Sequence, residues 1–276
     1  MSIETSWVIS TNDLENRLNE KPLSKDLLII DMTKESDYQE AHIPGAIFLD
    51  YAKIVKHAPP VVGMLPDPQQ FSETLSNLGI SPESYIVAYD DEGGGKAARF
   101  MWTMEIAGHK KMSLLDGGIH AWLSDKKPLS NKTPDIKQSQ YPVSFNDLTT
   151  VADADYIMAH LNQPNFCVLD TRSESEFTGA DKRAARAGHI PGAINLDWQE
   201  IKNNKDAQRL KPTEELKKML TGLGLSQEQE IVTYCHSHHR SALMYIALKS
   251  LGYPNIKGYP ASWSDWAVRD DKPVEI

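Results

Sequence analysis

A single cysteine opens a short run of ionisable residues, Cys235-His-Ser-His-His-Arg240. The run follows an apolar segment of β-type residues, 230–234, and precedes a segment of helical character, 241–251. A turn from a strand into a helix carries unpaired backbone N–H groups and lies at the positive end of the helix dipole. That environment favours the thiolate, which is the reactive form of cysteine. We therefore interpret Cys235 as a nucleophile, with added positive charge from three neighbouring histidines and Arg240.

Other chemistries fit this loop less well. Cysteine phosphatases place one more residue between cysteine and arginine than the four between Cys235 and Arg240, so a reacting centre smaller than phosphate, such as one sulfur atom, is favoured. A cysteine protease or acyl transferase needs a base and an oxyanion hole, and beyond His238 and His239 nothing marks one. A zinc ion could take Cys235, His236, His238 and His239, but four ligands in one short loop would crowd it. We predict no metal site.

The chain is a tandem repeat. The motif His42-Ile-Pro-Gly-Ala-Ile47 recurs as His189-Ile-Pro-Gly-Ala-Ile194. Further segments match in the same order and with similar spacing: 27–31 with 167–170, 78–81 with 223–226, 85–89 with 230–234, and 117–122 with 258–263. A fixed order of matching segments indicates a duplicated domain.

Each half alternates short apolar runs with helical patterns, the latter at 12–18 and 71–78 in the first half and at 153–161 and 216–223 in the second. This alternation predicts an α/β fold with parallel strands and helices on both faces of each small sheet. Residues 128–146 are rich in Pro, Ser, Asn, Lys and Gln, which is typical of a linker. The predicted domains are therefore 1–127 and 147–276.

The repeat separates structure from chemistry, because a feature present in both halves is more simply structural. Asp90 stands opposite Cys235 when the halves are aligned, and a carboxylate cannot replace a thiolate. We therefore predict that the first domain is catalytically inactive.

Four residues are shared by the two halves: His42 with His189, and Asp31 with Asp170. We expect the histidines to fix a loop by hydrogen bonding and the aspartates to hold turns. Trp198 and Tyr51 occupy equivalent positions in the two halves, so we expect Trp198 to pack in the core in preference to forming an aromatic wall beside the site.

The second half alone carries a basic insertion. Asp170 and His189 lie 19 positions apart, whereas their counterparts in the first half lie 11 positions apart. The second half therefore holds 8 more residues in this segment. The insertion holds Lys182, Arg183 and Arg186, and Arg172 follows a predicted strand end, as Cys235 does. Ligands of α/β sheets bind at such ends. We expect anion contacts, with Arg186 the first candidate, then Arg172, then Arg183.

Composition excludes several classes of protein. The formal net charge of −9 argues against nucleic acid as a partner, because phosphate binding needs a basic face. We see no signal peptide and no apolar run long enough to cross a bilayer. Two cysteines, Cys167 and Cys235, make a disulfide framework unexpected and indicate a reducing, cytoplasmic setting. Cys167 lies inside a strand-like run and is expected to be buried and inert, and the chain to be a monomer.

From about Trp7 to Trp266 the chain resembles the two-domain rhodaneses, the thiosulfate sulfurtransferases. The resemblance rests on the paired His-Ile-Pro-Gly-Ala motifs, the loop from Cys235 to Arg240 and the aspartate at the matching position of the first half. The His-His-Arg ending and the Asp-Asp-Glu-Gly-Gly-Gly run at 90–95 are similar to the bacterial branch typified by the Azotobacter enzyme.

The resemblance implies a ping-pong reaction without a cofactor. The Cys235 thiolate would take the outer sulfur of thiosulfate and release sulfite, and a thiophilic acceptor such as cyanide would then remove sulfur from the persulfide. Backbone N–H groups would hold the persulfide and Arg240 the sulfonate. The remaining loop residues would line the donor site: His236, Ser237, His238 and His239.

Two departures from the family affect the choice of donor. Some members carry an arginine where this chain has Glu176, so the contact made by that arginine would come from Arg172 or Arg186 or be absent. Members that prefer 3-mercaptopyruvate usually have Gly-Ser-Gly in the loop, whereas this chain has His-Ser-His at 236–238. This favours thiosulfate or another persulfide donor. The alternatives are a 3-mercaptopyruvate sulfurtransferase and a carrier that delivers persulfide sulfur to a partner protein.

Overall fold

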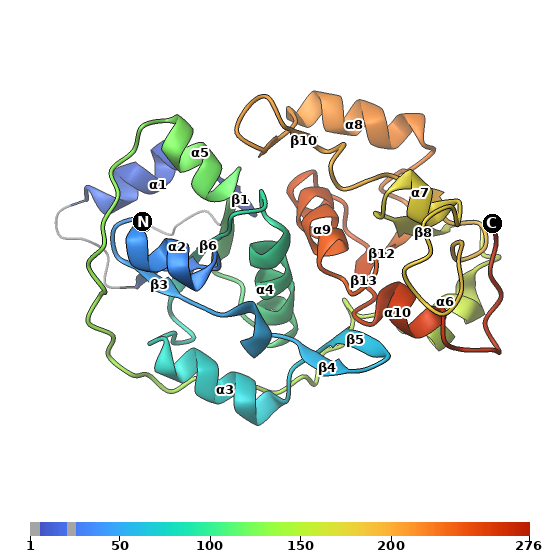
Figure 1. Cartoon of the computed structure of the whole chain (residues 1–276), viewed down its shortest axis with the longest axis horizontal. Helices are drawn as coiled ribbons and strands as arrows, with labels where there is room; N and C mark the ends of the chain where they lie inside the picture. Colours follow the sequence, from blue (N-terminus) through green and yellow to red (C-terminus); the bar gives the residue numbers. More distant parts are fainter. Residues whose placement is uncertain (1–5, 21–25) are drawn as a thin grey trace. The chain divides into compact units, whose positions relative to one another are not determined.

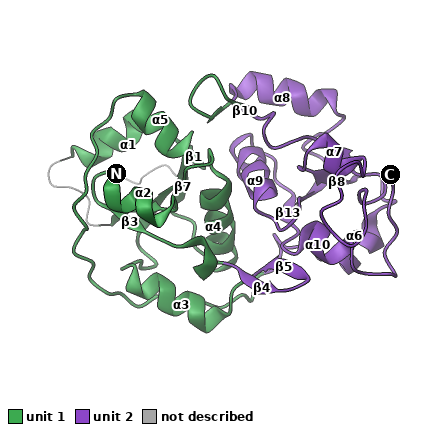
Figure 2. Cartoon of the chain, viewed as in Figure 1, with its two compact units in different colours: residues 1–54, 66–147, 203–210 green, residues 55–65, 148–202, 211–276 purple. Residues whose placement is uncertain are grey.

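The computed structural model describes residues 6–20 and 26–276, whose helices and strands are labelled in Figure 1. The chain forms two compact units (Figure 2). Unit 1 comprises 1–54, 66–147 and 203–210, and unit 2 comprises 55–65, 148–202 and 211–276. No helix within the described part of the chain is both long and apolar enough to cross a membrane.

Unit 1 contains a parallel sheet with strand order β1-β7-β6-β2-β3. Its strands are β1 (Val8–Ile9), β2 (Leu27–Asp31), β3 (Ala46–Phe48), β6 (Tyr85–Tyr89) and β7 (Met112–Leu115). Its helices are α1 (Thr11–Leu18), α2 (Glu35–Glu40), the 3-10 turn η1 (Tyr51–Lys53), α3 (Pro68–Asn77), α4 (Gly95–Ile106) and α5 (Gly118–Ser124).

Unit 2 contains a parallel sheet with strand order β13-β12-β8-β9. Its strands are β8 (Phe166–Asp170), β9 (Ile194–Asn195), β12 (Glu230–Tyr234) and β13 (Ile256–Gly258), with an antiparallel hairpin of β4 (Lys56–Ala58) and β5 (Val61–Met64). Its helices are α6 (Ala154–His160), α7 (Glu174–Phe177), α8 (Thr213–Gly222), α9 (Arg240–Ser250) and α10 (Ser262–Trp266). A small ribbon pairs β10 (Lys202–Asn203) with β11 (Arg209–Leu210), and its residues 203–210 belong to unit 1.

The two sheets confirm the predicted duplication of an α/β domain. The order β7-β6-β2-β3 in unit 1 matches β13-β12-β8-β9 in unit 2. Unit 1 adds β1 beside β7, and at the same place in unit 2 Val151 forms an isolated parallel bridge with Gly258. Helices flank both sheets, as expected when parallel strands are joined by helical crossovers.

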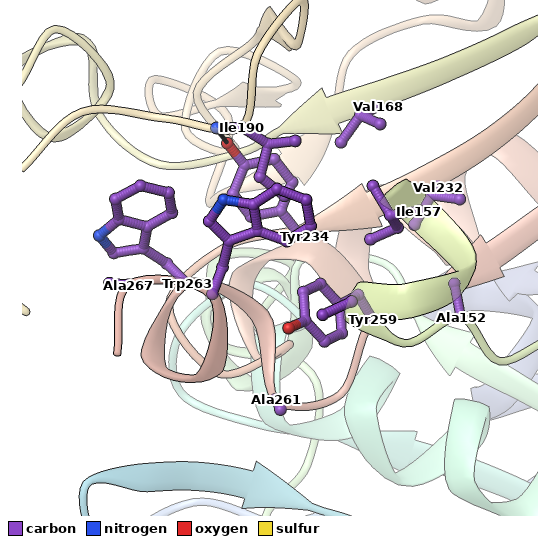
Figure 3. Close-up of a cluster of buried hydrophobic side chains, with 12 residues drawn as sticks. Ala152, Ile157, Val168, Ile190, Val232, Tyr234, Tyr259, Ala261, Trp263 and Ala267 are labelled. Carbon is purple, nitrogen blue, oxygen red and sulfur yellow. Dashed lines mark hydrogen bonds between the residues drawn. The ribbon is translucent and has the colours of Figure 1, made fainter. Parts of the chain in front are cut away.

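The central strands form where the sequence is continuously apolar. All five residues of β6 are buried, and so are the last four of β12. Parallel strands covered on both faces have this composition. In unit 2 the side chains of Tyr234, Trp263 and Val232 gather in a core with Ile157 and Ile190 (Figure 3). This core holds the strand end from which the cysteine loop departs.

The repeated His-Ile-Pro-Gly-Ala motif is a β-turn tied to the sheet. Proline precedes a glycine with positive φ, +79° at Gly45 and +71° at Gly192, which is the pattern of a type II turn. The isoleucine N–H of each turn donates to a strand tyrosine, Ile43 to Tyr89 at 3.2 Å and Ile190 to Tyr234 at 3.3 Å (Figure 3). The motif therefore recurs because each turn anchors to the end of a central strand.

The shared histidines hold the segment just before this turn. His42 Nδ1 donates to the Tyr38 carbonyl at 2.7 Å, and its ring stacks on Tyr38. His189 Nδ1 donates to the Phe177 carbonyl at 2.8 Å, and its ring stacks on Phe177. Both are structural, as the repeat predicts.

The shared aspartates hold the turns that follow their strands. Asp31 accepts a hydrogen bond from the Thr33 N–H at 2.8 Å, and Asp170 accepts one from the Arg172 N–H at 2.9 Å. This agrees with the structural role predicted for them.

Residues 128–146 contain no helix or strand and run along unit 1. Ser139 N–H donates to the Ser76 carbonyl at 3.0 Å, and the ring of Tyr141 is buried, with its hydroxyl 3.1 Å from His109 Nδ1. The segment is therefore fixed to the surface of this unit by hydrogen bonds and by one buried aromatic ring.

Candidate functional site

Cys235 lies at the carboxyl end of β12 and is followed within five residues by the first turn of α9. Only 1% of its surface is exposed. The short loop between strand and helix forces the chain to turn sharply, and His238 has a positive φ of +54° to make that turn. The structure thus places the cysteine at the strand-to-helix turn that the sequence predicts.

The start of α10 fixes this loop from behind. The Ser262 hydroxyl accepts hydrogen bonds from the N–H groups of Cys235, at 3.2 Å, and His238, at 3.0 Å, and donates to the Tyr259 carbonyl. The N–H groups of Trp263 and Ser264 donate to the carbonyls of the first two loop residues. The backbone of the loop is therefore held in one conformation before any ligand binds.

Electrostatics favour the Cys235 thiolate despite its burial. Burial alone would raise the pKa of this thiol, because a charge is costly in a site without water. The charge of Arg240, hydrogen bonds from the backbone N–H and hydroxyl of Ser241, and the N–H of Ser237 outweigh burial and lower the pKa of Cys235 to about 7. By contrast, burial raises the pKa of Cys167 to about 12, which agrees with the inert role predicted for it.

Arg240 carries an ion pair that the sequence does not reveal. Its two terminal nitrogens donate to the two carboxylate oxygens of Glu176, at 2.6 and 3.0 Å. Glu176 is 2% exposed, so the pair is screened little by water. Burial opposes ionisation of Glu176, but hydrogen bonds and charge from Arg240 prevail and lower its pKa to about 2.

The three loop histidines lie in different surroundings, and His236 does not add positive charge. Burial, followed by the nearby charge of Arg240, lowers the pKa of His236, so this ring is neutral at neutral pH. His238 is fully buried, with Nδ1 2.7 Å from the Ser241 hydroxyl. The ring of His239 lies 6.1 Å from that of Trp198. The prediction that His236 adds positive charge to the loop is therefore wrong.

Trp198 lies beside the cysteine loop, next to His239, and does not pack in the core. It is half-buried, and the ammonium group of Lys202 lies 3.8 Å from the centre of its ring. The prediction of core packing was wrong because a loop residue, His239, provides its aromatic neighbour.

The β4–β5 hairpin also packs against the loop, and β5 lies beside α10 (Figure 1). Gly63 lies so close that a Cβ atom there would be 2.3 Å from the Ser237 carbonyl oxygen. The neighbouring Val62 exchanges hydrogen bonds with the Ser264 hydroxyl through its N–H and its carbonyl. The hairpin therefore restricts access to the middle of the loop.

The predicted basic cluster is used elsewhere in the fold. The Arg186 guanidinium donates to four backbone carbonyls between Trp266 and Lys272. Arg172 is 2% exposed and donates to both carboxylate oxygens of Asp170. Both guanidinium groups therefore already have protein partners, backbone carbonyls for Arg186 and a carboxylate for Arg172. Of the remaining two basic residues, both exposed, Arg183 pairs with Asp181, and Lys182 faces solvent.

The counterpart loop in unit 1 contains its own anion. The Asp90 carboxylate is buried and accepts hydrogen bonds from the N–H groups of Glu92, Gly94 and Ala97 at 2.9, 2.8 and 3.0 Å. A strand-to-helix loop of this fold therefore binds negative charge through backbone N–H groups. In unit 1 the group bound in this way is the Asp90 carboxylate, which is part of the protein and cannot be exchanged for a substrate.

Replacing Asp90 with alanine should lower the free energy of unfolding by about 2 to 4 kcal/mol, because three buried N–H groups lose their acceptor. Any activity that depends on Cys235 should remain close to wild type per folded molecule, because Cys235 lies in unit 2. Denaturant unfolding and activity on the same samples test both statements. A large loss of activity in protein that is fully folded would show that unit 1 contributes to the chemistry.

The structure assembles Cys235, Arg240 and the rest of the loop with residues whose roles the sequence did not predict. Glu176 stood out only as a departure from the family, and no role was predicted for Ser241, Ser262 or Gly63. Glu176 could have been noticed as the last residue of a Ser-x-x-Glu capping box, which the structure confirms with Ser173. The ion pair between Glu176 and Arg240 could not have been predicted from the sequence. Across residues 6–20 and 26–276 no group of three or more His, Cys, Asp or Glu side chains is arranged to hold a metal ion.

Comparison with known proteins agrees with this geometry. The sequence profile described as a Rhodanese-like domain matches residues 10–125 and again 153–269. The thiosulfate sulfurtransferases of Azotobacter vinelandii and Pseudomonas aeruginosa are 38% and 37% identical over 269 residues, which cover 98% of this chain and 97% of each of theirs. The crystal structure of an Escherichia coli 3-mercaptopyruvate sulfotransferase aligns with a TM-score of 0.81 and 28% identity, covering 94% of this chain and 99% of that one.

Proposed function

The chain belongs to the rhodanese family, whose domain it carries twice, and from that premise we propose that it is a thiosulfate sulfurtransferase acting through a persulfide on Cys235. The observation that carries the proposal is the loop itself. It holds a buried thiol whose pKa is lowered to about 7, with the charge of Arg240 acting on it. A low-pKa thiol held by backbone N–H groups suits a nucleophile that must also stabilise a sulfur anion.

In the first half-reaction the Cys235 thiolate attacks the outer sulfur of thiosulfate. A new S–S bond forms to Cys235, and the S–S bond of thiosulfate breaks, so that sulfite leaves with the bonding electron pair. The loop N–H groups and the Ser241 hydroxyl, which stabilise the thiolate, are in position to stabilise the persulfide anion that replaces it. Arg240 attracts the sulfonate end of the donor by charge-assisted hydrogen bonding.

In the second half-reaction a thiophilic acceptor attacks the outer sulfur of the persulfide. With cyanide, a C–S bond forms, the S–S bond breaks and the Cys235 thiolate is restored as thiocyanate leaves. No electrons enter or leave overall, so the proposed reaction uses no redox cofactor or metal. The same thiolate must stay reduced, so we propose a reducing compartment, the cytoplasm, as its location, and one chain as the working unit.

Steady-state kinetics test the proposal. Initial rates measured over a grid of thiosulfate and cyanide concentrations should give parallel double-reciprocal lines, which are characteristic of a ping-pong mechanism. Intersecting lines would indicate that both substrates must be bound together and would rule out a free persulfide intermediate.

The same assay compares the alternatives. The sequence relatives in the range 37–38% identity are thiosulfate sulfurtransferases, and His236 and His238 occupy the loop positions where 3-mercaptopyruvate enzymes usually have glycine. We therefore expect a higher kcat/KM with thiosulfate than with 3-mercaptopyruvate. A sulfur carrier would instead keep its persulfide in cyanide and release it only to a partner protein.

Titration of the Cys235 thiol should give a midpoint near pH 7. The thiolate is the deprotonated form, so its fraction, and the rate of persulfide loading from thiosulfate, should rise with pH through this midpoint and level off above it. Thiolate absorbance in the ultraviolet measures the midpoint without a reagent that must enter the site, and a Cys235→Ser sample provides the blank. A midpoint at the ordinary cysteine value of about 8.5 would contradict the electrostatic account of the loop.

A further inference from the structure

The Arg240 guanidinium lies between two negative groups. On one side it donates to both oxygens of Glu176, and on the other its charge stabilises the Cys235 thiolate. The contact with Glu176 is the parallel, two-bond arrangement in which a guanidinium binds a carboxylate most strongly. The guanidinium has further N–H groups that can bind the sulfonate of a donor, as the Nε and a terminal nitrogen of Arg172 bind Asp170. Glu176 does not block these groups, but it offsets the positive charge that a second anion would meet.

The other cations near Glu176 do not replace the positive charge of Arg240 that Glu176 offsets. Arg172 and Arg183 both act on Glu176, but each is already paired with an aspartate, Asp170 and Asp181 respectively. Glu176 cancels the charge of Arg240, and the thiolate adds a further negative charge. Cys235, Arg240 and Glu176 together therefore carry one net negative charge, so each extra negative charge on the donor is costly beside them.

We propose that Glu176 sets the sulfur-donor class of this site by charge, favouring monoanionic donors of the form R–S–S⁻ or R–SO₂–S⁻ over the dianion thiosulfate. The inference rests on the proposed sulfurtransferase function and concerns the same cysteine. Glu176 acts on the donor through Arg240, so it is a positioning residue. With a thiosulfonate donor the Cys235 thiolate attacks the outer sulfur and a sulfinate leaves with the electron pair, giving the same persulfide.

The isosteric variant Glu176→Gln tests this inference. Glutamine fits the capping box with Ser173 as well as glutamate does, so α7 should keep its start. The amide oxygen can still accept one hydrogen bond from Arg240, but the negative charge is gone. Glu176→Asp keeps the charge and shortens the side chain. Glu174→Gln, at an exposed position of the same helix, removes a charge that has no contact with Arg240 in the hydrogen bonds and ion pairs described above.

The readout is the ratio of kcat/KM for thiosulfate to kcat/KM for methanethiosulfonate, with cyanide as the common acceptor. A ratio cancels any general loss of active protein. In Glu176→Gln this ratio should rise about tenfold over wild type. The variant removes one negative charge from the site, and that charge disfavours the dianion thiosulfate more than the monoanion. In Glu176→Asp and Glu174→Gln it should stay close to the wild-type ratio. A purely structural role for Glu176 would lower both rates and leave the ratio unmoved.

The outcomes separate the inference from the proposed function. If wild type uses both donors and the ratio is the same in Glu176→Gln, the charge-selection inference is wrong and the sulfurtransferase stands. If the ratio rises equally in Glu176→Asp, side-chain shape and not charge sets selectivity, and the inference is again overturned. If wild type transfers sulfur from neither donor, the proposed function itself fails.

Discussion

Replacing Cys235 with serine should reduce sulfur transfer by a factor on the order of 10⁴ or more, because a serine hydroxyl is not ionised near neutral pH and cannot form a persulfide. Serine is close in size and keeps a polar group facing the Ser241 and Ser237 donors. The fold should therefore survive, and far-ultraviolet circular dichroism should match wild type. The measurement is thiocyanate production from thiosulfate and cyanide.

Cys167→Ala is the matched control for this variant. Cys167 lies within β8 and is 7% exposed, and burial raises the pKa of its thiol to about 12. Its removal leaves a small core cavity but should leave turnover per folded molecule near wild type. Substantial residual transfer in Cys235→Ser, or a loss in Cys167→Ala that is not explained by unfolding, would contradict the assignment of the nucleophile.

Replacing Arg240 with alanine should lower kcat/KM for thiosulfate by roughly 10² to 10³, since both thiolate formation and sulfonate binding lose a charged partner. The direction of the pKa change follows from the site. Without the charge of Arg240, burial is opposed only by hydrogen bonds, so the pKa of Cys235 should rise and the pH–rate profile should move to higher pH. A variant whose profile keeps its midpoint near pH 7 would show that Arg240 does not stabilise the thiolate.

Arg240→Ala should also destabilise the protein by about 3 to 5 kcal/mol, because it leaves the Glu176 carboxylate buried without its partner. The double variant Arg240→Ala/Glu176→Ala removes both charges and should recover much of that stability. It should not recover activity. Denaturant unfolding of the wild type, the two single variants and the double variant gives the coupling energy of the pair. If the double variant is no more stable than Arg240→Ala, the ion pair contributes little to folding.

Much of the fold follows from local pattern. The apolar runs at 27–31, 85–89 and 230–234 become strands with those same bounds, because runs of aliphatic residues suit a strand that is buried on both faces. Helix starts are less regular. The predicted helix at 71–78 begins earlier, at Pro68, because Asp67 caps it through two N–H groups and proline suits the first turn.

The strand-to-helix turn that holds Cys235 was also predictable, whereas the ionic partner of Arg240 was not. Cys235 follows a strand and precedes a helix in sequence, so its environment is set by neighbours along the chain. Glu176 lies 64 positions from Arg240 and meets it only because β8 and β12 pair in parallel. The basic insertion shows the same limit, because the carbonyls that hold Arg186 come from a segment 80 or more positions away.

The repeat provides a comparison within one molecule. In both units the residue after the central strand accepts a hydrogen bond through its carbonyl from a later helix start, Asp90 from Ile119 at 3.0 Å and Cys235 from Trp263 at 3.0 Å. The same backbone therefore presents a carboxylate in one unit and a thiol in the other. The Glu92 N–H, which donates to the Asp90 carboxylate in unit 1, corresponds in position to the Ser237 N–H, which favours the Cys235 thiolate in unit 2.

The measurement that tests the central claim most directly is the mass of the intact protein before and after thiosulfate, and again after cyanide. The reduced protein should gain the mass of one sulfur atom from thiosulfate, on the peptide that contains Cys235 and not on the one with Cys167. Cyanide should remove that sulfur as thiocyanate and restore the starting mass. If thiosulfate adds no sulfur to Cys235, or the added sulfur stays in the presence of cyanide, the persulfide mechanism proposed here is contradicted.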